Sequence, residues 1–243
     1  MLSTPMFICN PDVSATSSLP VPPQAESAPN RRFRPEELYP EHFTLRDIEV
    51  PSGDMIFLAC PGSERKCPCC GYHAHHPNSI VIAIDGACRN NGRDGARASI
   101  GVYHGPDHGW NESARLSPEL IQTNQVAELA ACEIAVLYAC VIQKNWDNIA
   151  EEIEGDKGKL CTVVIKSDSE YVVRGMTEWI YKWKANGWVN AKGLPVTNRE
   201  HFDRIDSIVE SLEKEQVTVQ FWHVPREYNQ EADKLATSAL DGN

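Results

Sequence analysis

The sequence predicts an α/β protein in which helices flank a mixed sheet, and three observations support this fold class. The run at residues 80–84 is continuously apolar and mostly β-branched, as in a strand buried on both faces. Residues 124–143 place apolar side chains at helical spacing. Strand-like and helix-like segments then alternate along the rest of the chain, which is typical of a sheet covered by helices.

The first half of this region is expected to form three strands and a long helix. The pairs Asn91-Gly92 and Asp94-Gly95 are turn formers that follow the first strand. Further strands are expected near 98–103 and 110–116. The helix over 124–143 is indicated by apolar residues that recur every three or four positions: Val126, Leu129, Ala130, Ile134, Leu137 and Val141.

The second half is expected to alternate between strands and helices. The β-branched run at 162–166 predicts a fourth strand, and short helical patterns continue to residue 184. A helix over 198–214, a strand over 217–223 and a helix over 229–240 complete the chain. This order makes an α/β domain over residues 80–243.

Two segments of different composition precede that domain. Residues 1–45 hold eight of the 16 prolines, mixed with Ser and Ala, and are expected to be disordered because they offer little apolar surface to bury. Residues 46–79 contain one short apolar run and a Cys/His-rich stretch. We expect them to form a linker or a small metal-binding appendage.

The composition of the 243 residues, 42% hydrophobic and 23% charged, is typical of a soluble globular protein. We expect no membrane association, because no apolar run of about 20 residues is evident, and no secretory or transit peptide. Nine cysteines then predict reduced thiols inside the cell, with nucleus or cytoplasm favoured and the mitochondrion left open. A net charge of −11 means that any nucleic-acid binding must come from a local patch.

Four carboxylates stand near the ends of expected elements. Asp85 and Asp168 each follow a buried strand, Glu128 lies one turn into the long helix, and Asp233 lies in the closing helix. Surface acids are one interpretation of these positions. The other is a metal centre, because carboxylates held close together repel and need cations to coexist. Oxygen ligands suit Mg²⁺ or Mn²⁺, and such a cluster suits two-metal hydrolysis of a phosphodiester.

The four acids lie in the motifs IAIDGACRNNG, TNQVAELAAC, VIKSDSEYVV and HVPREYNQEADKLA. These motifs resemble those of type 1 ribonuclease H, the cellular eukaryotic form especially, over about residues 80–240. The resemblance implies a ribonuclease H-like fold with a five-stranded mixed sheet flanked by helices. It also implies an endonuclease that hydrolyses the RNA strand of RNA–DNA hybrids without sequence specificity.

The same resemblance implies roles for individual residues. Asp85, Glu128, Asp168 and Asp233 fall on the catalytic positions that bind two Mg²⁺ (or Mn²⁺) ions, one to activate water and one to stabilise the leaving 3′ oxygen. Asp85 would bridge both ions. The matching substrate-binding positions are Asn91, Thr123, Asn124, Gln125, Trp179 and Asn198. Turn formation by Asn91 and helix capping by Asn124 are the structural alternatives.

The segment 174–199 contains five Lys or Arg residues and one Glu, in an otherwise acidic chain. Three tryptophans interleave with these charges, which fits a channel for the DNA strand. Trp183 and Trp188 fit a core position equally well. Two features depart from the animal enzymes: Ile121 replaces a phosphate-pocket arginine, and the loop after His223 lacks a mobile histidine, so that His223 more naturally matches a strand-end residue.

Two other functions compete with this interpretation. The altered histidine loop leaves open a catalytically weak or inactive RNA–DNA hybrid-binding protein, although all four acids are present. A proofreading exonuclease of the same superfamily is a weaker rival, because it needs an Asp-x-Glu on the first strand, where this chain has Ala87.

The Cys/His-rich stretch lies outside the resemblance. Cys67-Pro68-Cys69-Cys70-Gly71 contains the C-P-x-C-G turn of a zinc knuckle, in which Cys67 and Cys70 can bind one ion. Cys60 and His73 are the nearest residues that could complete a four-coordinate structural Zn²⁺ site. The alternative is a thiol-rich linker, because structural zinc sites usually draw their ligand pairs from more distant segments.

Overall fold

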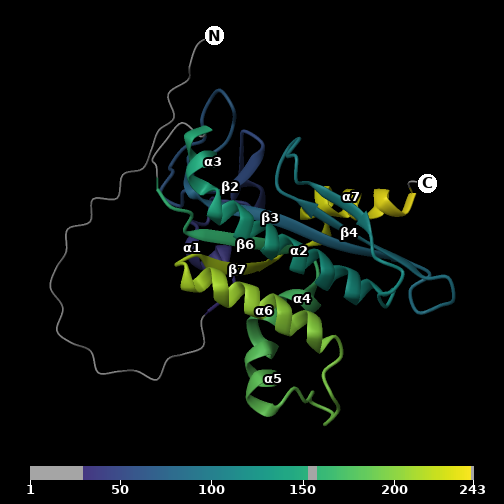
Figure 1. Ribbon diagram of the computed structural model, residues 1–243. Helices are drawn as coiled ribbons and strands as arrows, with labels where there is room; N and C mark the ends of the chain where they lie inside the picture. The colour runs from purple at the N-terminus through teal and green to yellow at the C-terminus, as the bar shows by residue number, and fades with distance from the viewer. Residues whose placement is uncertain (1–29, 153–157, 242–243) are drawn as a thin grey trace, which may run out of the picture.

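The computed structural model describes residues 30–152 and 158–241, so the disorder expected of residues 1–29 lies outside the described residues. These residues form one mixed sheet with helices on both sides (Figure 1). The strands are β1 (Glu49–Ser52), β2 (Met55–Ala59), β3 (His75–Arg89), β4 (Arg97–Tyr103), β5 (Glu112–Arg115), β6 (Thr162–Ser167) and β7 (Thr218–His223). The α-helices are α1 (Pro35–Leu38), α2 (Asn124–Lys144), α3 (Trp146–Glu152), α4 (Glu170–Arg174), α5 (Ile180–Asn186), α6 (Arg199–Lys214) and α7 (Gln230–Asp241). Short helical turns are η1 (Leu45–Asp47), the π-helical η2 (Gly175–Trp179) and η3 (Arg226–Tyr228).

Strand β3 is the centre of the sheet. One of its edges pairs antiparallel with β2 and then with β4, and the other edge pairs parallel with β6, which pairs parallel with β7. The parallel strands are joined through helices, as parallel pairing requires. This arrangement confirms the predicted α/β class with a mixed sheet. Strand β3 also continues to Arg89, so the expectation that the strand ends before Asp85 is wrong.

The sheet has seven strands within the described residues, where five were expected. The five expected strands correspond to β3 to β7, and β1 and β2 are additional. All five residues of β2 are buried, and β3 begins at His75, earlier than expected, so that it offers a free edge to β2. Residues 49–59, expected within a linker or appendage, therefore belong to the main sheet.

Residues 30–45 are ordered, in contrast to the disorder expected for the whole segment 1–45. The Phe33 amide donates to the Phe221 carbonyl (3.0 Å), and the Phe221 amide donates to the Arg31 carbonyl (2.7 Å). The Phe33 ring is 2% exposed and packs edge-on against Trp222 at 5.3 Å. The average composition of 45 residues gave no indication that Phe33 and Tyr39 pack on an apolar face of the sheet.

Two apolar layers cover the two faces of the sheet. The larger core lies between the sheet and helices α2 and α6, and a smaller core around Phe33, Ile56 and Trp222 lies on the other face. The helix α7 packs on β3, β4 and β5. In the part of the chain that the structure describes, α2 is long and apolar enough to cross a membrane by length and composition, which the sequence expectation overlooked. Most of its buried residues, from Leu129 to Ile142, belong to the larger core, as those of a core helix do.

Candidate active site

Parallel pairing of β3 with β6 brings two of the predicted acids together. The register pairs Ala83 with Lys166. Two residues further along, Asp85 on β3 and Asp168 immediately after β6 are therefore neighbours across the strands. The charge of Asp168 raises the pKa of Asp85, as expected for neighbouring carboxyl groups.

Gly86 brings Glu128 to the same place. A Cβ atom at Gly86 would lie 2.2 Å from the Glu128 amide nitrogen, so the first turns of α2 pack directly on the backbone of β3. The Glu128 carboxylate accepts hydrogen bonds from Ser169 Oγ (2.5 Å) and Asn124 Nδ2 (3.1 Å). Ser169 follows Asp168, so Glu128 is held against the segment that carries the second acid.

A second glycine positions Asp233 from the opposite face of the sheet. Gly101 on β4 pairs directly with Asp85, so the two residues share a face of the sheet. A Cβ atom at Gly101 would lie 2.2 Å from the Ala232 carbonyl oxygen, so α7 approaches as closely as only glycine allows. Asp233, the next residue of α7, forms an ion pair with Arg226 and raises the pKa of Asp85 through its charge.

The electrostatics of the cluster follow from burial and repulsion. Burial raises the pKa of Asp85 to about 7, and the charges of Asp168 and Asp233 act in the same direction. Burial also raises the pKa of Glu128, against the hydrogen bond from Ser169. Such carboxylates need a positive charge in order to ionise together. Hard carboxylate oxygens of this kind suit Mg²⁺ or Mn²⁺.

The four carboxylates are neighbours, but they do not form a closely packed group. Among the described residues, no three of them have oxygen atoms that all lie within 4.8 Å of one another. Asn229, which was not predicted from the sequence, links β3 to Asp168. Its Nδ2 donates to the Ile84 carbonyl (2.8 Å) and to Asp168 Oδ1 (3.1 Å).

Four of the predicted substrate-binding residues surround the start of α2. Thr123 caps this helix by accepting a hydrogen bond from the Val126 amide (3.3 Å), and Asn91 Oδ1 accepts one from the Asn124 amide (3.2 Å). Gln125 is exposed. Asn91 lies in a turn, as the structural alternative expected, whereas helix capping by Asn124 is wrong, because Thr123 is the cap. The Asn124 side chain donates to Glu128 instead.

Trp179 and Asn198 meet at a residue that the sequence analysis did not single out, Tyr171. Asn198 Nδ2 lies 3.2 Å from the Tyr171 hydroxyl, and the Trp179 ring lies 6.1 Å from the Tyr171 ring. The Arg174 guanidinium lies 5.1 Å above the Trp179 ring. Tyr171 is three residues beyond Asp168, so the rings of Tyr171 and Trp179 lie beside the acidic cluster.

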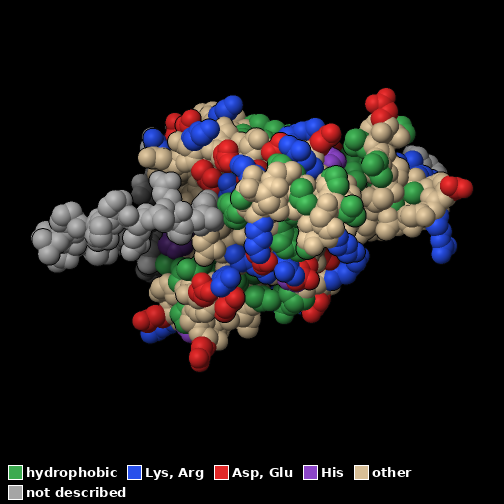
Figure 2. All heavy atoms as spheres, turned by 90° about the horizontal axis from the view of Figure 1, so that it is seen from below, with side chains coloured by type: hydrophobic (Ala, Val, Ile, Leu, Met, Phe, Trp, Pro, Cys, Tyr) green, Lys and Arg blue, Asp and Glu red, His purple; other side chains and the backbone are tan. Residues whose placement is uncertain are grey.

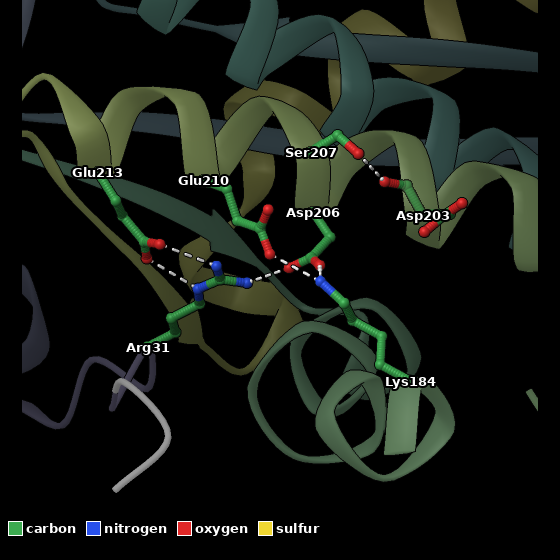
Figure 3. Close-up of polar contacts among 7 residues, drawn as sticks. All are labelled: Arg31, Lys184, Asp203, Asp206, Ser207, Glu210 and Glu213. Atoms are coloured by element: carbon green, nitrogen blue, oxygen red, sulfur yellow. Dashed lines mark hydrogen bonds and ion pairs between the residues drawn. The ribbon is translucent and has the colours of Figure 1, made fainter. Parts of the chain in front are cut away.

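Part of the segment 174–199 is engaged in packing and ion pairs. Lys184 Nζ binds Asp206 (2.6 Å) and Glu210 (2.7 Å), as Figure 3 shows. Trp188 is buried, and the Trp183 ring packs on Phe202 at 5.0 Å. The core interpretation of both tryptophans is therefore confirmed. Basic and acidic side chains are interspersed on the face seen from below, where α5 and α6 lie (Figure 2).

His223 is the last residue of β7. It lines an open cavity of about 340 Å³ together with Arg32, Arg34 and Trp222. This is the strand-end placement that the sequence analysis favoured for His223. Ile121, at the position of the missing arginine, is 70% exposed.

The predicted zinc ligands are only partly brought together. The Sγ atoms of Cys67 and Cys70 lie close to each other and to Cys69, whereas Cys60 and His73 are not in this group. Cys60 is buried, and the buried His73 ring stacks on Phe43 at 4.2 Å with its Nδ1 3.3 Å from Ser63 Oγ. The third thiol is that of Cys69, which occupies the x position of the C-P-x-C-G pattern and was not expected to be a ligand.

Comparison with known proteins gives consistent results. A model of the RNase H family matches residues 77–241. Ribonuclease H1 of Mus musculus is 36% identical over 163 residues, which are 65% of this chain and 49% of the mouse protein. Ribonuclease H of Schizosaccharomyces pombe is 29% identical over 229 residues, which are 91% of this chain and 72% of the yeast protein. The chain spans about half the length of the first curated relatives that it matches.

The chain is also similar to solved structures. The foamy viral protease-reverse transcriptase in complex with dsDNA is 27% identical, with a TM-score of 0.45, over 65% of this chain and 92% of that one. LC11-RNase H1 in complex with an RNA/DNA hybrid is 23% identical, with a TM-score of 0.40, over 66% of this chain and 96% of that one.

Proposed function

This chain belongs to the RNase H family, and on that basis we propose that it is an endonuclease that hydrolyses the RNA strand of RNA–DNA hybrids without sequence specificity. The observation that carries the proposal is the convergence of Asp85, Glu128, Asp168 and Asp233 from four elements onto one place. Burial among other acids raises the pKa of Asp85 and of Glu128, and such perturbed carboxyl groups are typical of a functional site.

The four acids would hold two divalent ions, Mg²⁺ or Mn²⁺. When bound, such ions lower the pKa of a coordinated water and stabilise the charge on a leaving oxygen. Asp85, whose pKa is raised by the charges of both Asp168 and Asp233, would contribute to both sites. It must release its proton to do so, because a protonated carboxyl group is a poor ligand.

Glu128 and the residues around it would recognise the RNA strand. Ser169 and Asn124 hold the Glu128 carboxylate in one orientation. The amides of Asn91, Asn124 and Gln125 can both donate and accept hydrogen bonds, as the ribose 2′-hydroxyl does. A strand with hydroxyls would therefore be preferred at this position, and a DNA strand would be left uncut.

The other strand of the hybrid would lie along Tyr171, Trp179 and Asn198. An aromatic ring offers a surface for sugars and bases, and the adjoining Arg174 can neutralise a phosphate. Hybrid geometry is recognised through backbone and grooves, so base identity should have little effect.

The test is a cleavage assay on labelled RNA–DNA hybrid, duplex DNA, duplex RNA and single strands, each with and without Mg²⁺. We expect cleavage of RNA in the hybrid alone, and only with the metal. Ile121 and the loop after His223 favour the second candidate, a hybrid-binding protein with little or no catalysis. That protein would retain the hybrid in a binding assay and leave the RNA intact.

A further inference from the structure

The loop 60–74, which joins β2 to β3, carries three thiols at one point. The Sγ atoms of Cys67, Cys69 and Cys70 all lie within 4.8 Å of one another, and those of Cys67 and Cys69 are 2.7 Å apart. All three cysteines are free thiols, and Cys69 and Cys70 are exposed. Among the described residues this is the only group of three metal-type ligands that lies so close together.

The backbone of the loop holds these thiols in place. The Gly71 amide donates to the Cys67 carbonyl (2.8 Å), and the Cys67 amide donates to the Tyr72 carbonyl (2.7 Å). Gly71 has a φ of +78°, which glycine adopts without strain.

We propose that Cys67, Cys69 and Cys70 bind one Zn²⁺ ion, with a water molecule as the fourth ligand. Thiolates are preferred zinc ligands, and Zn–S bonds of about 2.3 Å in a tetrahedron place sulfur atoms about 3.8 Å apart. The Cys67–Cys69 separation of 2.7 Å is shorter than that value, and all three sulfur atoms lie within 4.8 Å of one another, so small side-chain rotations suffice. No further Cys or His among the described residues joins the group, which leaves the fourth position to solvent.

The loop is fixed to the sheet at both ends. The Cys60 amide donates to the Ala74 carbonyl (2.7 Å), Ser63 Oγ accepts from the Ala74 amide (3.2 Å), and Lys66 forms an ion pair with Asp47. The loop enters β3 at His75, and Asp85 lies ten residues further along this strand. Ten residues of strand span roughly 30 Å. The zinc would therefore stabilise the loop without taking part in chemistry at the carboxylates.

The experiment uses the full chain, stripped of metal and kept reduced. Zn²⁺ is titrated in competition with a chromophoric chelator, and Co²⁺ is used in parallel because its thiolate complexes absorb strongly. The discriminating variant is Cys69→Ser, because Cys69 is a ligand here and a bystander in the set Cys60, Cys67, Cys70 and His73. Cys161→Ser removes an exposed thiol elsewhere and serves as the matched control.

We expect about one Zn²⁺ per chain for the wild type and for Cys161→Ser. The variants Cys69→Ser and Cys67→Ser should each lose at least ~10-fold in affinity and the Co²⁺–thiolate absorption. Far-UV circular dichroism and Mg²⁺-dependent cleavage should be unchanged in Cys69→Ser. A reduced wild type that binds no Zn²⁺, or a Cys69→Ser variant that binds it as tightly as the wild type, would overturn the proposal.

Discussion

Gly86 lies directly beneath the backbone of Glu128, and a Cβ atom at Gly86 would come within 2.2 Å of the Glu128 amide nitrogen. The contact is between two backbones, neither of which can rotate away. It therefore sets the distance between the helix that carries Glu128 and the strand that carries Asp85. Gly101 has the same relationship to α7 on the opposite face, so two glycines determine how closely the acids approach.

Gly86→Ala should therefore separate Glu128 from Asp85. We expect a loss of stability of about 1–3 kcal/mol from the forced backbone shift, together with a loss of cleavage activity larger than the change in stability explains. Urea unfolding and the hybrid cleavage assay measure the two effects. Gly109→Ala is the control, because a Cβ atom there meets nothing within 4 Å. If Gly86→Ala matched Gly109→Ala in both assays, the close approach would be unimportant.

Asp85 predicts a pH dependence of stability in the metal-free protein. Its folded pKa of about 7 lies above the usual value of 3.8, so the folded state binds a proton more tightly than the unfolded state does. The stability associated with protonated Asp85 is complete below about pH 4 and is lost as the pH rises to about 7. The advantage of Asp85→Asn in melting temperature should therefore grow between pH 4 and 7 and then level off. Mg²⁺ should reduce that advantage by stabilising the wild type, and an advantage independent of pH would contradict the assignment.

Arg31 should be essential for stability although it precedes the sheet. Its guanidinium bonds Asp206 (2.5 Å) and Glu213 (2.9 Å), and both Arg31 and Asp206 are 3% exposed (Figure 3). Removal of one partner of a buried ion pair costs about 3–5 kcal/mol of folding stability. Because Lys184 also binds Asp206, the loss of stability in Arg31→Met should lie near the lower end of that range. Arg34→Met, which breaks an exposed pair with Glu37, should leave the stability nearly unchanged. Equal midpoints in urea for the two variants would show that the buried network is dispensable.

Substitution of Lys182 and substitution of Lys184 should have different effects on hybrid binding and on stability. Lys182 is exposed and makes no ion pair with the described residues, whereas Lys184 is held by Asp206 and Glu210. Lys182→Ala should weaken hybrid binding and reduce the slope of log affinity against log salt by about 0.9, the value for one phosphate contact. Lys184→Ala should lower stability and leave the slope nearly unchanged. The reverse result would place the DNA strand along Lys184.

The order of helices and strands was predictable because periodicity is local. A run such as 80–84 or 124–143 contains its own signal. The additional strands β1 and β2 were not predicted, because MIFLA is too short to form a core and becomes buried only through the unexpected extension of β3 to His75. Burial by a segment that is distant in the sequence cannot be predicted from the local pattern of apolar residues.

The acids of the site were identifiable from their motifs, whereas their partners were not. Ser169, Asn229 and Tyr171 are ordinary polar residues in sequence, and only the fold places them against Glu128, Asp168 and Asn198. The charge count over 174–199 likewise could not reveal that Lys184 is neutralised by Asp206, 22 residues away. In the cysteine turn, spacing indicated Cys67 and Cys70, but the direction of the Cys69 side chain depends on the backbone of the loop.

Single-turnover cleavage of a labelled RNA–DNA hybrid by the wild type, Asp85→Asn and Asp168→Asn tests the central claim most directly, with hybrid binding measured in parallel. The account predicts Mg²⁺-dependent cleavage by the wild type. Both variants should bind the hybrid with nearly unchanged affinity and cleave it at least ~100-fold more slowly, because the groove contacts survive while metal binding fails. Cleavage by either variant at close to the wild-type rate would show that the reaction takes place elsewhere.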